Sequence, residues 1–232
     1  MDRTDDKNIE NQMKLYIQYS LGKDTENYLN GVFEFKHLKH GRENIREDLL
    51  AKIDPVLRNK IEKAVNKEDA QKAIFDFLSK WRKENSKFIE SVIKNLKSEW
   101  NLSSQETIKK LETLYQKQFL FDKTTIYLTS LPLCPYSYKE KYLFVYLRDS
   151  AEKQVKTILH ELNHFMFYFY YPELKKKLGH EKYELLKESL SYFSNPGEKG
   201  KPNEKGLREL YASKDWKNLD EAIKSGLDFL SN

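Results

Sequence analysis

The sequence predicts an α+β fold that is predominantly helical, with a small β-sheet packed on one long helix and a helical region before it. Three observations support this prediction. Up to about residue 100, apolar side chains recur at the spacing of amphipathic helices. Two later runs, 124–129 and 141–148, are rich in the β-branched and aromatic residues that strands favour. A third run, 151–171, contains neither Gly nor Pro and is apolar along one arc, which predicts the long helix.

Local signals divide the first half of the chain. Asp54-Pro55 combines an N-cap residue with proline at the first helical position, so a helix is expected to begin there. Ser103 to Glu106 matches a capping box, which predicts that a separate helix begins there and runs to about residue 118. The change of character near residue 100 predicts two parts, a helical N-terminal region at 1–100 and a second domain at 101–232.

The second half reads as strands followed by helices. Prolines in 131–136 predict a loop between the two strands. After the long helix, Gly179 is expected to close a short helical turn, and a further helix is predicted from His180 to about Ser194. The Gly- and Pro-containing stretch 195–206 predicts a mobile loop, and 207–230 predicts a last helix.

The composition is that of a soluble globular protein. Charged residues make up 33% of the chain and apolar residues 39%, and no stretch reaches the roughly 18 apolar residues of a membrane span. We therefore expect no membrane association. The net charge of +5 arises from interspersed basic and acidic residues, without the blocks of like charge that would predict nucleic-acid binding.

The cysteine content and the first residues point to the cytoplasm. Cys134 is the single cysteine, which excludes an internal disulfide and fits a reducing compartment. Residues 1–6 are polar and acidic, without the apolar segment of a secretory signal. We therefore expect a cytoplasmic protein, and the sequence does not predict its oligomeric state.

The long helix carries His160-Glu161-Leu162-Asn163-His164, an H-E-x-x-H motif. Positions i and i+4 share one helix face, so both imidazoles can bind one metal ion. Glu161 lies beside them and can take a proton from a water bound to that metal, as in metalloproteases. The alternative is a surface helix that carries these residues by chance. Phe167, Tyr168 and Tyr171 on the histidine side argue against it, because they need cover from another segment.

A catalytic zinc site has three protein ligands and one open position, so a third ligand is expected. One class of zinc peptidases has a histidine six residues after the second motif histidine, where this chain has Tyr170. The helix predicted at 180–194 offers glutamates instead, at 181, 184 and 188. Glu188 borders the apolar face of that helix, whereas Glu184 lies deeper in its solvated face. We therefore prefer Glu188 as ligand, and either residue can instead be an ordinary solvated acid.

The motif followed by Glu188-Ser189-Leu190-Ser191-Tyr192-Phe193 resembles the gluzincin metallopeptidases, with a minigluzincin-like catalytic core. In that family a second helix carries a glutamate ligand in an E-small-apolar-small-x-aromatic setting. The resemblance covers about residues 124–193 only. The gap from His164 to Glu188 is longer than in thermolysin-like members, whose shorter gap favours Glu184 as the ligand.

The resemblance implies zinc-dependent hydrolysis of a peptide or protein substrate. It implies that His160, His164 and Glu188 bind Zn²⁺ and that Glu161 is the general base. The strand at 141–148 is expected to bind an extended substrate by edge pairing. A donor is expected to stabilise the oxyanion. The candidates for that donor are Tyr192, Tyr211 and His180.

Three other readings are compatible with the same residues. The chain can be a catalytically inactive metal-binding protein, a helical interaction protein, or a metal hydrolase acting on a non-peptide substrate. The presence of Glu161, the base that an inactive relative would have lost, favours the enzyme. Residues 1–100 are expected to cap the site, to select substrates or to regulate activity. Cleavage specificity, and endo- versus aminopeptidase action, are not predicted.

Overall fold

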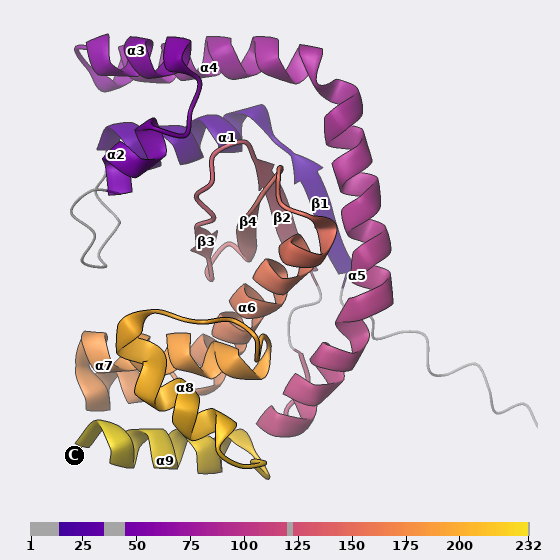
Figure 1. Cartoon of the computed structure of the whole chain (residues 1–232), viewed down its shortest axis with the longest axis vertical. Helices are drawn as coiled ribbons and strands as arrows, with labels where there is room; N and C mark the ends of the chain where they lie inside the picture. The colour runs from indigo at the N-terminus through magenta and orange to yellow at the C-terminus, as the bar shows by residue number, and fades with distance from the viewer. Residues whose placement is uncertain (1–13, 35–44, 120–122, 232) are drawn as a thin grey trace, which may run out of the picture. The chain divides into compact units, whose positions relative to one another are not determined.

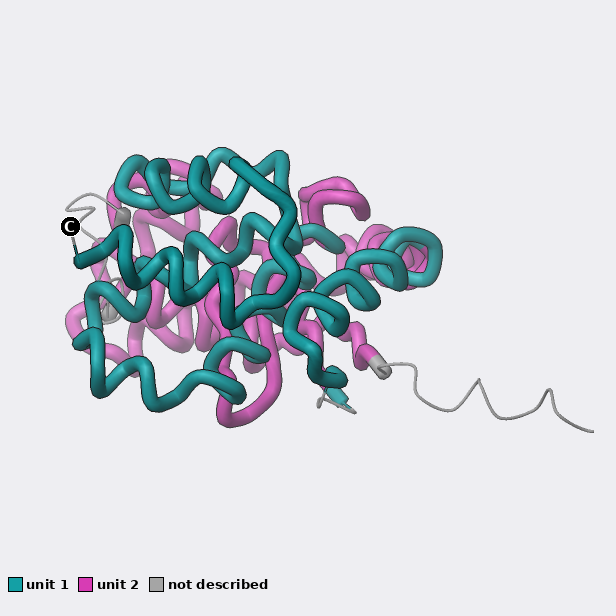
Figure 2. Tube along the Cα trace, turned by 90° about the horizontal axis from the view of Figure 1, so that it is seen from below, with its two compact units in different colours: residues 1–14, 99–123, 155–232 teal, residues 15–98, 124–154 magenta. Residues whose placement is uncertain are grey.

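The computed structural model describes residues 14–34, 45–119 and 123–231, and residues 1–6 lie outside these ranges. Within them the predicted fold class is confirmed, because the chain is predominantly helical with one small mixed sheet. Two compact units interleave along the sequence (Figure 2). Unit 1 comprises Met1–Lys14, Glu99–Lys123 and Val155–Asn232, and unit 2 comprises Leu15–Ser98 and Thr124–Gln154.

The break between Ser98 and Glu99 falls close to the division predicted at residue 100. The strand segment that follows groups with the N-terminal helices in unit 2. The separate functional role expected for residues 1–100 stays a prediction. So does the packing of the sheet on the motif helix.

Unit 2 contains the sheet. Its strands are β1 (Lys14–Tyr19), β2 (Lys123–Thr129), β3 (Tyr136–Ser137) and β4 (Tyr142–Tyr146). They follow the order β1-β2-β4-β3 (Figure 1). β2 and β4 run parallel and β3 runs antiparallel to β4. Both strands predicted from β-branched and aromatic runs are therefore confirmed.

β4 is an interior strand, so the expected edge pairing of 141–148 with a substrate is wrong. β2 pairs along one side of β4, and the two-residue β3 pairs along the other, with Tyr136 opposite Leu143. The backbone nitrogen of Phe144 also donates to the carbonyl of Pro135. This short strand was not predicted, because the prolines close to it indicate a loop at 131–136: proline is normally excluded from interior strand pairing.

β1 corrects a second expectation, since the chain before residue 100 was predicted to be helical almost throughout. Tyr16 is exposed and Ile17 is buried, which is the alternation of a strand with one face on a core. The segment is six residues long, so a helical and an extended reading of its apolar residues are hard to separate without its partner β2.

The helices of unit 2 enclose its core. They are α1 (Leu21–Tyr28), continued by the π-helical turn η1 (Leu29–Glu34), then α2 (Ile45–Leu50), α3 (Pro55–Lys63), α4 (Lys67–Glu84) and the start of α5 (Ser86–Tyr115). Asp54 caps α3 as predicted, accepting from the backbone nitrogen of Val56 at 2.8 Å. The core cluster is formed by apolar residues from the segments α1 to α4 and from Leu131, among them Val32, Leu50, Leu57, Ile74 and Leu78.

The described residues of unit 1 include the end of α5, two short 3-10 helices (Ser191–Phe193 and Pro202–Glu204) and four further α-helices, the first of which begins in unit 2. These are α6 (Ala151–Tyr170), α7 (Leu174–Leu190), α8 (Lys205–Ala212) and α9 (Leu219–Ser231). α6 confirms the predicted long helix. Gly179 interrupts α7 at a φ of 74°, as expected for a glycine that closes one helical turn before the next helix. Within the described part of the chain, no helix combines the length and apolarity needed to cross a membrane.

Two predicted helix boundaries in unit 1 are wrong. α5 runs without a break through Ser103 and Ser104, whose hydroxyls donate back to the carbonyls of Glu99 and Trp100 one turn earlier. Serine hydroxyls make such bonds inside helices as well as at caps, so the four-residue pattern alone does not set a boundary. The single helix predicted at 207–230 is two helices, α8 and α9, separated at residues 213–218.

Candidate metal centre

The H-E-x-x-H residues form a compact cluster on α6. One ligand atom from each of His160, Glu161 and His164 lies within 4.8 Å of the others. The two imidazole rings have their centroids 4.4 Å apart. Glu161 and His164 are buried, and His160 is partly exposed. The helix therefore brings both imidazoles and the carboxylate together, as the spacing predicts.

α7 provides the cover that the aromatic residues of α6 were expected to need. The ring of Tyr183 on α7 lies 5.0 Å from that of Phe167, measured between centroids. The ammonium of Lys187 lies over the ring of Tyr168 and donates a hydrogen bond to the hydroxyl of Tyr168 at 3.1 Å. The histidine side of α6 is thus part of the interior of unit 1, and the reading of α6 as a simple surface helix does not fit.

Asn163, at one of the two variable positions of the motif, forms hydrogen bonds that connect α6 to α7 and to α5. Its amide nitrogen donates to the carbonyl of Leu190 at 2.8 Å. Its amide oxygen accepts from the hydroxyl of Tyr115 on α5 at 2.7 Å. Sequence reasoning missed this residue, since nothing in the local pattern identifies its partners. The bond to Leu190 holds the end of α7, and with it Glu188, against the motif helix.

Glu188, the predicted third ligand, lies among cations, and among the described residues it is not one of those whose ligand atoms meet within 4.8 Å. Its Oε1 is 3.0 Å from Nζ of Lys187 and its Oε2 is 3.2 Å from Nζ of Lys201. Burial opposes ionisation, but the two ammonium groups outweigh it and lower the pKa of Glu188 to about 2. The charge of Glu188 also raises the pKa values of His160 and Glu161.

Glu184, the alternative ligand, is held elsewhere on α7. Both its oxygens lie 3.3 Å from the hydroxyl of Tyr168, and Oε2 is 2.8 Å from Nζ of Lys187. His180, a candidate oxyanion donor, is exposed, and its Nδ1 lies 4.0 Å from Glu184. These contacts describe a polar cluster at Lys187, which makes Glu184 a counter-ion of that lysine.

Glu198 also contacts the motif, although the sequence gives no reason to single it out. Its Oε2 lies 3.0 Å from Nδ1 of His160. Burial alone would lower the pKa of His160, but this hydrogen bond and the surrounding carboxylates raise it overall. A carboxylate on one ring nitrogen fixes the tautomer and the orientation of a histidine and leaves the other nitrogen, Nε2, for a metal. The only signal in the sequence is an acid in a Gly- and Pro-containing loop, which is too common to be informative.

Residues 195–204, which we call the strap, carry Glu198 and Lys201 to the cluster. Arg208 on α8 holds the strap in place. Its guanidinium donates to Oε2 of Glu204 at 2.9 Å, to the carbonyl of Glu198 at 3.2 Å and to Oγ of Ser191 at 2.7 Å. The loop predicted to be mobile is thus held by a buried arginine and contacts the motif helix directly.

Gly200 is required for this arrangement. Its φ is 63°, in the region that favours glycine, and a Cβ there would clash with Nε of Arg208. We expect Gly200→Ala to lower the free energy of unfolding by about 2 kcal/mol, because it combines an unfavourable φ with a clash. Urea unfolding measures this. Gly197→Ala is the control, since nothing lies within 4 Å of its added Cβ; equal effects of the two substitutions would contradict the expectation.

Burial and nearby charges shift the pKa values of Glu161 and His164 in opposite directions. Burial raises the pKa of the Glu161 carboxyl to about 7. Burial, with the positive charges of Lys187 and Lys201, lowers the pKa of His164 well below its usual range. A neutral imidazole is the form that binds a metal, and a carboxyl with a pKa near neutrality suits a general base. Oε2 of Glu161 lies 3.1 Å from Nδ1 of His164.

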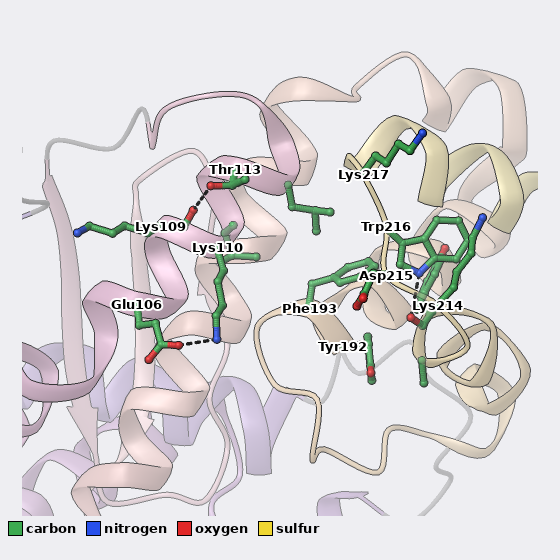
Figure 3. A pocket seen from close by; sticks show the side chains of 14 residues that line it. Glu106, Lys109, Lys110, Thr113, Tyr192, Phe193, Lys214, Asp215, Trp216 and Lys217 are labelled. Atoms are coloured by element: carbon green, nitrogen blue, oxygen red, sulfur yellow. Dashed lines mark hydrogen bonds and ion pairs between the residues drawn. The ribbon is translucent and has the colours of Figure 1, made fainter.

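Tyr192 and Tyr211, the other predicted catalytic residues, both line an open cavity of about 640 Å³ in unit 1 (Figure 3). Trp216 lines the same cavity, and α5 forms its opposite wall. Tyr211 is buried, and its hydroxyl lies against Gly226 of α9; among the described residues it has no hydrogen-bond partner. The contacts described for the two tyrosines are with this cavity and with α9, so their role as oxyanion donors stays a prediction.

Comparison with protein-family models, with curated proteins and with solved structures gives no match to this chain. The case for a metal centre therefore rests on the residues of unit 1 themselves: a paired-histidine motif with a carboxylate beside it, and Glu198 of the strap on one of the two histidines. Glu188 acts on His160 through its charge.

Proposed function

We propose that this chain is a zinc-dependent peptidase of the gluzincin type, with His160, His164 and Glu188 as zinc ligands and Glu161 as the general base. The observation that carries the proposal is the convergence of ligand atoms from His160, Glu161 and His164 within 4.8 Å on a covered helix face. Zinc bound there would act as a Lewis acid and lower the pKa of a water molecule to about 7.

The donor set fits zinc. Two imidazole nitrogens with one carboxylate oxygen are a common ligand set of catalytic zinc, and they leave a position open for water and substrate. Glu188 is ionised at neutral pH, because its pKa is about 2, and the lowered pKa of His164 keeps that ring neutral. Both groups are therefore in the protonation state that metal binding requires.

In the proposed reaction each residue has a separate task. Glu161 accepts a proton from the attacking water and delivers it to the amine that leaves when the peptide bond breaks. Glu198, 3.0 Å from Nδ1 of His160, would orient that ring and leave Nε2 for the metal. Asn163 holds the end of α7, and therefore Glu188, at a fixed distance from the motif helix.

The single cysteine favours a cytoplasmic setting.

Metal analysis of two variants tests the ligand set. We expect about one zinc per chain in the purified protein. Glu188→Ala should weaken zinc binding about 100-fold, because it removes one of three protein ligands. Glu184→Ala should retain zinc, because Glu184 contacts Tyr168 and Lys187. Loss of zinc with Glu184→Ala alone would make Glu184 the ligand, and a protein that binds no zinc after reconstitution would end the enzyme proposal.

A further inference from the structure

Lys201 stands out among the charged groups near the proposed centre, because it approaches a carboxylate that we assign to the metal. Its Nζ lies 3.2 Å from Oε2 of Glu188 and 3.8 Å from Oε1 of Glu204. Its side chain is 40% exposed, whereas that of Glu188 is 17% exposed. The side chain of Lys201 therefore contacts both solvent and the mostly buried Glu188.

Glu188 already has a cation at each of its two oxygens. Lys187 lies 3.0 Å from Oε1, is almost fully buried, and has Glu184 as a second partner at 2.8 Å. A divalent ion bound to the same carboxylate would stand next to both ammonium groups. Like charges at such short distances repel strongly where solvent is partly excluded. One ammonium must therefore withdraw or the metal must bind more weakly.

Lys201 is the ammonium that can withdraw. It belongs to the strap, its side chain reaches solvent, and Glu204 is available as a second carboxylate. Lys187 is enclosed by α6 and α7 and cannot reach solvent without disturbing the contact with Tyr168. We propose that Lys201 competes with the metal for Glu188, so that this strap lysine sets the metal affinity of the centre and is displaced when the metal binds.

The inference rests on the proposed zinc site and is tested separately from it. The dissociation constant for Zn²⁺ is measured by competition with a chromophoric chelator at pH 7 and constant ionic strength. Lys201→Gln should bind Zn²⁺ about tenfold more tightly than the wild type, equivalent to about 1.4 kcal/mol. Lys199→Gln, an exposed lysine of the same strap, makes the same change in net charge and should leave the affinity unchanged.

Each outcome decides one question. An unchanged or weaker affinity of Lys201→Gln would overturn the competition while leaving the zinc site intact. A wild-type protein without zinc binding would instead remove the proposed function, and the inference with it. If Lys201→Gln fails to fold, acetylation of the wild-type protein decides: the amine of Lys201 should become several-fold more reactive when Zn²⁺ is added, with Lys199 as internal reference, and unchanged reactivity would count against displacement.

Discussion

Glu161→Gln is expected to reduce peptide hydrolysis about 10³-fold while leaving zinc content and folding unchanged. Glutamine has the same shape as glutamate but cannot accept a proton from water, so the substitution removes general base catalysis, which contributes 10²–10⁴-fold in typical enzymes. The zinc ligands are His160, His164 and Glu188 in our proposal, so none of them is altered. Turnover of a fluorescence-quenched peptide library, followed alongside zinc content, measures both properties on the same samples.

The control for this experiment is Glu181→Gln, which makes the same chemical change at an exposed position of α7. It should retain full turnover. Peptide hydrolysis that survives Glu161→Gln would remove Glu161 as the base. A wild-type protein that binds zinc but does not hydrolyse peptides would favour an inactive metal-binding protein or a hydrolase of another bond, and the metal centre would then stand without the peptidase activity.

Asp24→Ala is expected to have the largest effect on stability, because it removes the acceptor at the centre of a buried network in unit 2. Asp24 is fully buried. Its carboxylate accepts from the hydroxyls of Thr129 at 2.6 Å, Ser130 at 2.8 Å and Tyr19 at 2.9 Å. Asn27 extends the network, donating to Oγ1 of Thr129 at 2.9 Å. The network joins α1 to the end of β2, two segments that are about a hundred residues apart in sequence.

Removing this carboxylate leaves several buried donors without an acceptor. Each such group costs about 1–3 kcal/mol, so we expect Asp24→Ala to lower the free energy of unfolding by about 3–5 kcal/mol at pH 5. Urea unfolding followed by circular dichroism measures the difference. Asp76→Ala, at an exposed position of α4, is the control and should change stability by less than about 0.5 kcal/mol.

The pH dependence of this difference has a definite sign. Burial raises the pKa of Asp24 above its ordinary value of 3.8, although hydrogen bonds from Thr129, Ser130 and Tyr19 oppose that shift. Between pH 3.8 and the folded pKa, the folded protein keeps a proton on Asp24 that the unfolded chain releases. The resulting contribution to stability is complete below pH 3.8 and is lost as the pH rises through the folded pKa. The stability difference between wild type and Asp24→Ala should shrink with rising pH, and a difference that grows would contradict the raised pKa.

Several elements could be predicted because their signals are local. The cap at Asp54 depends on two neighbouring residues, and α3 begins there as expected. The break at Gly179 depends on the φ of one residue. The capping-box pattern at Ser103 predicted a helix start that is wrong. The serine hydroxyl bonds to the carbonyl one turn back instead, and α5 continues through this position. The edge role of β4 was wrong for a related reason, since pairing partners cannot be read from one strand.

By itself the sequence determined that His160 and His164 share one face of a helix with Glu161 beside them, because a spacing of four residues places two side chains together wherever the helix lies. Only the tertiary structure decided what surrounds them. Glu198 reaches His160 across 38 residues of sequence, and Lys201 reaches Glu188 across 13. Such contacts depend on the path of a loop, which is set by its anchors and close approaches rather than by a repeating pattern. The helical face is local geometry, whereas its charged environment is a product of packing.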